Sequence, residues 1–239
     1  MGRGLLAGLI ALALAAPQVA AADAPQLRPT GRSSLIARIL RPTWAHSAPA
    51  GSAPVRARIG PRADWAGGAV GLMVLDGRRA RGRLWLKVAL PSRPNGATGW
   101  IDRDVVRLVR THWRVVVRVD ARRLSLLHDG RLVLTTRVVV GAPATPTPRG
   151  LFAVYERVRQ APGAVVGPWA LHLTAHSRVL HAYDGGPGRI ALHGREGGLL
   201  ADPLGTAASH GCVRMRSAVI RRLAADLVPG TPVHIRARG

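Results

Sequence analysis

The sequence predicts a mainly β protein with a small all-β unit, a second β-rich unit and one short helix near the C-terminal end. From residue 35 onward, short apolar runs recur between Gly-, Pro- and Asp-containing turn signals. Several of these runs are rich in valine or alternate apolar and polar residues, which is typical of strands. Only the stretch after Arg216 places its apolar residues at helical spacing.

The first residues have the composition of a secretory signal peptide. Arg3 precedes an apolar run from Leu5 to Ala16, and Pro17 and small residues follow. A membrane-spanning helix needs about 20 apolar residues, so this run is too short to be one. We therefore predict that residues 1–22 are a cleaved signal peptide and that the mature protein is exported to the periplasm or cell wall with no stable membrane span. A retained signal anchor is the alternative.

A polar, proline-containing linker is predicted at residues 23–34, followed by a small β module at 35–108. Its strands are expected at Leu35-Ile36-Ala37, Val70–Val74, Arg83–Val88 and Thr98–Ile101, with a turn at Asp76-Gly77. The last two of these runs resemble the closing strands of a bacterial SH3-like barrel. Trp85 and Trp100 lie in them, and we expect both to be core residues rather than ligand-binding ones.

The second unit is predicted to span residues 113–236. Strands are expected at Val115-Val116-Val117, at Leu124–His128 and, after the hairpin signal Asp129-Gly130, at Leu132–Val140. A loop stiffened by three prolines follows at Gly141–Gly150, before a strand at Leu151–Tyr155. Ser217 is expected to cap the short helix, which is followed by Pro229-Gly230 and a closing strand, Val233-His234-Ile235.

The chain is strongly basic, with a formal net charge of +23. No basic helix or aromatic RNA-binding signature accompanies the arginines, so the sequence does not favour nucleic acid as a partner. For an exported protein, the charge favours attraction to anionic cell-envelope polymers.

The single cysteine, Cys212, lies in the sequence Ser209-His210-Gly211-Cys212. An unpaired cysteine in an exported chain suggests a reactive thiol, although an inert buried thiol is the alternative. A histidine activates such a thiol by accepting its proton, and His193 and His210 are both candidates. Gly211 permits unusual backbone angles and close approach of a substrate, so the amides of Gly211 and Cys212 are expected to contribute to an oxyanion hole.

His193, followed after fifteen residues by Ser209-His210-Gly211-Cys212-Val213-Arg214, resembles the signature of the L,D-transpeptidase (YkuD-type) catalytic domain. The valine-rich strands and the proline loop before this signature follow the family's order. The resemblance covers roughly Trp113 to Ile235, about half of the chain, and implies a β-sandwich catalytic domain.

The resemblance also implies roles for the signature residues. Cys212 would be the nucleophile that attacks peptidoglycan tetrapeptide stems and releases the terminal D-alanine, with His193 as its base. Ser209 and His210 would shape the pocket. Arg214 would hold an anionic group of the stem. Some family members have serine after the histidine, whereas Gly194 offers only its backbone carbonyl.

The acyl-enzyme would then transfer to an amine of a second stem, giving a 3→3 cross-link, or exchange its terminal D-amino acid. Water as acceptor would instead give an L,D-carboxypeptidase, and a non-catalytic wall-binding protein is a further alternative. No cofactor is implied, and carbapenem-type β-lactams are expected inhibitors. The spacing of His172, His176 and His181 does not favour a metal site, because the Glu of a His-Glu-x-x-His motif is missing. Asp184 and Asp202 have glycine and proline neighbours and are expected to be turn residues.

Overall fold

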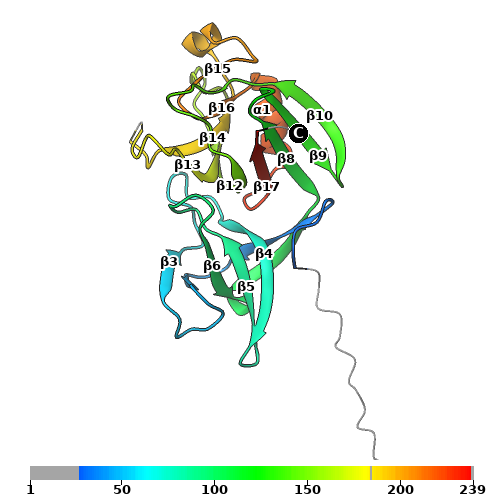
Figure 1. Ribbon diagram of the computed structural model, residues 1–239, viewed down its shortest axis with the longest axis vertical. Helices are drawn as coiled ribbons and strands as arrows, with labels where there is room; N and C mark the ends of the chain where they lie inside the picture. Colours follow the sequence, from blue (N-terminus) through cyan, green and yellow to red (C-terminus); the bar gives the residue numbers. More distant parts are fainter. Residues whose placement is uncertain (1–26, 184, 238–239) are drawn as a thin grey trace, which may run out of the picture.

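The computed structural model describes residues 27–183 and 185–237, which form two curled β units, one above the other in Figure 1. The predicted mainly β fold is confirmed, and the described part of the chain contains a single α-helix. The predicted signal peptide (1–22), the first residues of the predicted linker (23–26) and Asp184 lie outside the described residues. No helix among those described is both long and apolar enough to cross a membrane.

The N-terminal unit is one seven-stranded sheet with the strand order β3-β2-β6-β5-β4-β1-β7. Neighbouring strands in it are antiparallel. Its strands are β1 (Ser34–Ile39), β2 (Thr43–His46), β3 (Val55–Ile59), β4 (Gly71–Ala80), β5 (Arg83–Ala89), β6 (Thr98–Asp102) and β7 (Val106–Thr111), with a 3₁₀ turn, η1 (Arg103–Val105), before β7. Trp85 is buried, and Trp100 is half-buried.

The turn predicted at Asp76-Gly77 is wrong, because both residues lie inside β4. The chain reverses at Arg81 and Gly82, which have φ angles of 49° and 76°. Contacts with a distant segment explain the difference. The Asp76 carboxylate accepts two hydrogen bonds from the Arg28 guanidinium, at 3.1 and 3.0 Å. A Cβ added to Gly77 would lie 1.9 Å from a methyl carbon of Leu27, so this position admits only glycine without rearrangement.

The C-terminal unit is built on an eight-stranded sheet with the order β10-β9-β8-β17-β12-β13-β14-β16. Its elements are β8 (Trp113–Arg118), β9 (Arg123–His128), β10 (Arg131–Arg137), β12 (Gly150–Arg159), β13 (Trp169–His176), β14 (Arg189–His193), β16 (Val213–Arg214), β17 (Pro232–Arg236) and the helix α1 (Ser217–Asp226). Two short strands, β11 (Val140–Gly141) and β15 (Ala207–Ser209), pair in parallel, and a 3₁₀ helix, η2 (Gly197–Ala201), precedes β15.

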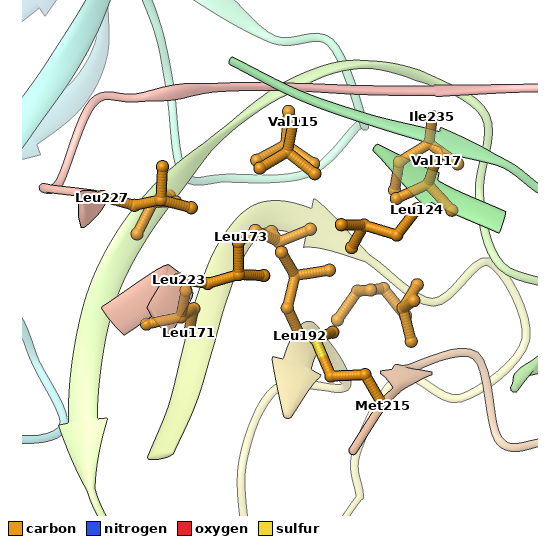
Figure 2. Packing of buried hydrophobic residues seen from close by; sticks show 14 of the residues in the cluster. Val115, Val117, Leu124, Leu171, Leu173, Leu192, Met215, Leu223, Leu227 and Ile235 are labelled. Carbon is orange, nitrogen blue, oxygen red and sulfur yellow. The ribbon is translucent and has the colours of Figure 1, made fainter. Parts of the chain in front are cut away.

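The core of this unit lies between the curled sheet and α1 (Figure 2). Leu171, Leu192 and Met215 are fully buried in it. The helix contributes Ile220, Leu223 and Ala224, which recur at the 3–4-residue spacing of one helical face. The predicted cap at Ser217 is wrong by one position: the residue before the helix is Arg216, and Ser217 is the first helical residue.

Side chains of the N-terminal unit bond directly to the C-terminal unit. Asn95 bonds both backbone groups of His176, accepting from its N–H at 2.8 Å and donating to its C=O at 2.7 Å. Arg93 donates to the carbonyl of Ser177 at 2.6 Å. In return, the Tyr155 ring of β12 packs within the hydrophobic core of the N-terminal unit. These contacts fix the position of one unit against the other.

Candidate active site

The end of the curled sheet brings the signature residues together. β14 and β16 pair in parallel, with Leu192 beside Val213 and His193 beside Arg214. Side chains alternate between the two faces of a strand, so His193 and Arg214 point to one face, and Leu192 and Val213 point into the core. The pairing therefore places the histidine and the arginine side by side.

Cys212 lies immediately before β16, on the same face as Arg214. Its sulfur accepts a hydrogen bond from the backbone N–H of Ala191 at 3.4 Å. A pocket of about 350 Å³ opens on this face and is lined by Cys212, His193, His210 and Arg214. The only thiol of the chain thus faces a cavity large enough for a peptide fragment.

A short hydrogen-bond network holds the loop that carries the thiol. Buried Ser209 donates from Oγ to the Cys212 carbonyl at 2.6 Å and accepts from the Gly211 N–H at 3.1 Å. Gly211 has φ 115°, an angle that side-chain-bearing residues rarely adopt. Because its N–H is engaged by Ser209, Gly211 does not offer the expected oxyanion donor in this conformation. The Cys212 N–H has no hydrogen-bond partner within the described part of the chain, so it is free to donate.

The proline loop supports the same segment from the other side. Buried Thr147 donates from Oγ1 to the Gly211 carbonyl at 2.8 Å and accepts from the Gly141 N–H, also at 2.8 Å. Thr145 donates from Oγ1 to the Ser209 carbonyl at 3.1 Å. The proline loop, which is expected to be stiff, is therefore hydrogen-bonded directly to the cysteine loop.

His193 is 5% exposed, and its Nδ1 lies 2.7 Å from the Gly194 carbonyl. A carbonyl only accepts hydrogen bonds, so Nδ1 carries the proton and Nε2 is the unprotonated, basic nitrogen of the neutral ring. A Cβ added to Gly194 would lie 2.9 Å from Ser217 Oγ and 3.1 Å from the Gly167 Cα, so the site excludes a side chain here. The backbone carbonyl of Gly194 orients the imidazole.

Burial shifts the pKa values of the two groups in opposite directions. It lowers the pKa of His193 to about 4, against an opposing contribution from the hydrogen bond to Gly194. Burial also raises the pKa of the Cys212 thiol, with the Ala191 N–H and the Arg214 charge acting the other way. At neutral pH both groups are therefore uncharged in the free protein.

Arg214 is 7% exposed and is paired with Asp202, with Nη1 and Oδ2 2.5 Å apart. Asp202 was expected only to form a turn, but it also neutralises this buried guanidinium in part. The Nε of Arg214 has no hydrogen-bond partner among the residues described. His210 is exposed at the pocket rim, where its Nδ1 lies 3.4 Å from the Tyr183 hydroxyl.

The histidines considered as metal ligands do not form a cluster. Within residues 27–183 and 185–237, no group of three His, Cys, Asp or Glu residues is arranged to hold a metal ion. Burial, followed by the charge of Arg189, lowers the pKa of His172 and of His176 to about 4. Both are therefore neutral at pH 7.

The sequence analysis missed the other wall of the pocket. Glu156 could have been identified from the sequence, because it is an acidic residue within a buried strand, where unpaired carboxylates are rare. Asp64 and Trp65 carry no local signal, because only the packing of the two units brings them to the pocket. The missed lining residues include Asp64, Trp65, Tyr155, Glu156 and Arg189.

Comparison with known proteins agrees with the residues found in this pocket. The family model of the YkuD L,D-transpeptidase catalytic domain matches residues 112–235. YkuD of Bacillus licheniformis, a proposed L,D-transpeptidase, is 31% identical over 123 residues, which make up 52% of this chain and 65% of that relative. The matched part thus spans slightly less than two thirds of the relative's length.

Two solved structures are similar over part of the chain. A cysteine-to-serine mutant of the Enterococcus faecium L,D-transpeptidase is 22% identical, with a TM-score of 0.40 over 52% of this chain and 49% of that one. The L,D-transpeptidase LdtMt1, solved in complex with imipenem, is 12% identical, with a TM-score of 0.43 over 68% of this chain and 98% of that one. The family model alone covers more than half of the sequence, and on that match the chain belongs to the family of L,D-transpeptidase catalytic domains of the YkuD type.

Proposed function

We propose that the protein is an exported cysteine L,D-transpeptidase that acts on peptidoglycan tetrapeptide stems through a thioester acyl-enzyme. The observation that carries this proposal is the shared pocket of Cys212 and His193, in a chain that belongs to this family. Export rests on the sequence of residues 1–22, and binding to anionic envelope polymers rests on the net charge of +23.

In the first step, the Cys212 sulfur attacks the carbonyl carbon between the third and fourth residues of the stem. The thiol proton passes to Nε2 of His193, the nitrogen left free by the bond from Nδ1 to Gly194. Because the free protein holds both groups uncharged, the transfer of the proton accompanies the attack. The Cys212 N–H is the candidate donor to the oxyanion.

Collapse of the tetrahedral intermediate breaks the amide bond, and His193 gives its proton to the departing amine of D-alanine. An amine of a second stem then attacks the thioester and loses a proton to His193, which returns the proton to the sulfur. The product is a 3→3 cross-link, or an exchanged terminus when the amine belongs to a free D-amino acid. With water as acceptor, the same steps yield a tripeptide.

Arg214 is proposed to bind a carboxylate of the stem. Its guanidinium lines the pocket and is held by Asp202 at 2.5 Å. The 35–108 module is proposed to be SH3-like. Two of its residues, Asp64 and Trp65, line the catalytic pocket.

The proposal is tested by mass spectrometry of the products formed from disaccharide-tetrapeptides, with Cys212→Ala as the control. We expect cross-linked dimers and released D-alanine from the wild-type protein and neither from the variant. Tripeptide alone would identify the carboxypeptidase instead. Unchanged substrate with the wild-type protein would contradict both activities and favour a wall-binding role.

A further inference from the structure

A loop from the N-terminal unit forms part of the catalytic pocket. Residues 63–68, which we call the Trp65 loop, lie between β3 and β4 in the sequence. Asp64 and Trp65 line the same pocket as Cys212 and His193. Trp65 is 59% exposed, so its ring is open to a ligand in this pocket.

The Trp65 loop is fixed in place by bonds to two neighbouring residues of β12. The Ala66 N–H donates to Glu156 Oε1 at 2.5 Å, and the Tyr155 hydroxyl donates to Asp64 Oδ2 at 3.1 Å. Within the loop, the Ala63 N–H donates to the Gly68 carbonyl at 2.8 Å. Trp65 is therefore an exposed ring on an anchored backbone, which limits the entropy lost when a ligand binds to it.

Glu156 carries a buried charge that the protein does not fully satisfy. The residue is 1% exposed, and its Oε2 has no hydrogen-bond partner within the described part of the chain. Nδ1 of His172 lies 3.8 Å from Glu156 Oε2. Burial keeps that imidazole neutral by lowering its pKa to about 4. A buried carboxylate in this state favours the approach of a cation.

Arg189 lines the same pocket and its positive charge acts on Asp64 and Glu156, but its hydrogen bonds go to other groups. Its guanidinium lies 4.5 Å above the centre of the Tyr155 ring and donates to the carbonyls of Leu173 and Pro91. Arg214, which also lines the pocket, is paired with Asp202. Asp64, Glu156 and Arg189 then leave a net charge of −1 in the lining. In a chain with a net charge of +23, a negative pocket wall is a local exception.

The negative wall lies within reach of a ligand bound at the cysteine. Glu156 pairs with His172, and His172 pairs with Ala191, whose N–H bonds the sulfur of Cys212. Two strand spacings, about 10 Å, therefore separate the Glu156 backbone from that of Ala191. The side chains narrow this gap, since both Glu156 and His172 line the pocket and the Trp65 ring packs edge-on to His172 at 6.1 Å.

We propose that Asp64, Trp65 and Glu156 form a subsite for a primary ammonium group of the peptide substrate. The Trp65 face and the Asp64 carboxylate contact the ammonium, and the buried Glu156 charge strengthens its attraction. This subsite rests on the proposed function and adds substrate selectivity to it. The ammonium is the side-chain amine of a diamino acid at the third position of the donor stem.

The test compares tetrapeptide stems whose diamino acid carries a free or an N-acetylated side-chain amine. The rate of acyl-enzyme formation without acceptor reports the donor stem. Transfer to an acceptor is not compared, because N-acetylation removes the nucleophilic amine itself. We expect the wild-type protein to favour the free amine by about tenfold in acyl-enzyme formation, which corresponds to ~1.4 kcal/mol.

Three variants locate the preference in the protein. Trp65→Ala and Glu156→Gln should reduce it to less than about threefold, because each removes one attraction for the cation. Glutamine retains an oxygen to accept the Ala66 N–H, so the loop anchor is kept. Trp44→Ala is the matched control: Trp44 is also half-exposed in the N-terminal unit but lies outside the pocket, so the preference should remain.

The subsite is overturned if the wild-type protein forms the acyl-enzyme from free and acetylated peptides at the same rate, or if the preference survives in Trp65→Ala and Glu156→Gln. The absence of any acyl-enzyme with either peptide would instead contradict the proposed function. In that case, the subsite is tested by binding alone. Equal dissociation constants of the free and acetylated peptides for Cys212→Ala would overturn it.

Discussion

At the scale of single residues, Cys212 and His193 both line the pocket, and both are uncharged at neutral pH. Their opposite pKa shifts have one cause, burial, which penalises the thiolate and the imidazolium alike. A preformed ion pair would leave the thiol reactive toward any electrophile. The neutral pair instead makes reaction depend on a substrate that positions its carbonyl and receives the oxyanion donor.

The dependence of acylation on pH follows from the base. In the proposed mechanism kcat/KM requires neutral His193, so kcat/KM should stay level from about pH 5.5 to 8 and fall only as the pH approaches about 4, where the imidazole takes up a proton. Stopped-flow or quenched-flow acylation with a tetrapeptide measures this profile, with circular dichroism at each pH to confirm that the protein is folded. A fall with a midpoint near pH 6.5 would contradict the neutral-pair description.

Cys212 should also accept the acyl group of a carbapenem, because the strained β-lactam carbonyl is an electrophile for a thiol in this pocket. Incubation with imipenem should raise the intact mass of the wild-type protein by one drug molecule and leave Cys212→Ala unchanged. Peptide mapping assigns the added mass. An equal adduct on Cys212→Ala would show that the reaction occurs elsewhere.

At the scale of elements, the proline loop at Gly141–Gly150 positions the cysteine loop through Thr147. Thr147→Val keeps the shape of the side chain but leaves the buried N–H of Gly141 and C=O of Gly211 without this partner. We expect a loss of about 2 kcal/mol in the free energy of unfolding and a lower kcat. Urea denaturation measures the first and acylation kinetics the second.

Thr135→Val is the matched control for that substitution. Thr135 is exposed on β10, so its free energy of unfolding should change by less than about 0.5 kcal/mol. Equal effects of the two substitutions would contradict a specific role for Thr147.

Strands and turns that depend on local sequence were predictable, and those set by distant contacts were not. The Asp129-Gly130 hairpin formed as expected, because both residues adopt the positive φ that this turn requires. The same dipeptide type at Asp76-Gly77 became strand, since Leu27 and Arg28 pack and bond there. The short strands β2 and β3 lack a continuous apolar run, and the sequence analysis did not identify them.

For the candidate site, the sequence supplied the residues near the nucleophile but not their partners. His193, Ser209 and Arg214 are recognisable because the family motif joins them to Cys212. The sequence predicts only a turn at Asp202, because its ion pair with Arg214 forms across the folded loop and leaves no local signal. Trp65 is 147 positions from Cys212, and only the packing of the two units brings it to the pocket.

At the scale of the whole molecule, both units build the pocket, so its integrity depends on their interface. His176 is part of that interface, since Asn95 bonds its backbone, and its imidazole is itself buried. His172 lies on the same strand, beneath Trp65. The protonation of these buried histidines therefore couples the stability of the molecule to pH.

Mild acid should destabilise the protein. The pKa of His172, His176 and His193 is about 4 in the folded state, and the unfolded value is about 6.5. The unfolded chain therefore binds more protons below pH 6.5, and stability, fully present above that value, is lost as the pH falls toward 4. Each histidine contributes on the order of 3 kcal/mol at most over this range.

Urea midpoints at pH 7.5, 6 and 5 measure this loss before most carboxylates protonate. The midpoint should fall steadily across the three values, and it should fall less in His176→Gln, which removes one of the three groups. A constant midpoint in the wild-type protein would contradict the assignment of neutral, buried histidines.

The central claim is that Cys212 carries the acyl group of a peptidoglycan stem. Its most direct test is rapid-quench intact-mass analysis of the signal-free protein mixed with a disaccharide-tetrapeptide and no acceptor, with D-alanine measured in the same samples. The account predicts one stem, less D-alanine, bound through a hydroxylamine-sensitive bond at Cys212, with one D-alanine released per acyl-enzyme formed. D-alanine release at an unchanged rate in Cys212→Ala would contradict it.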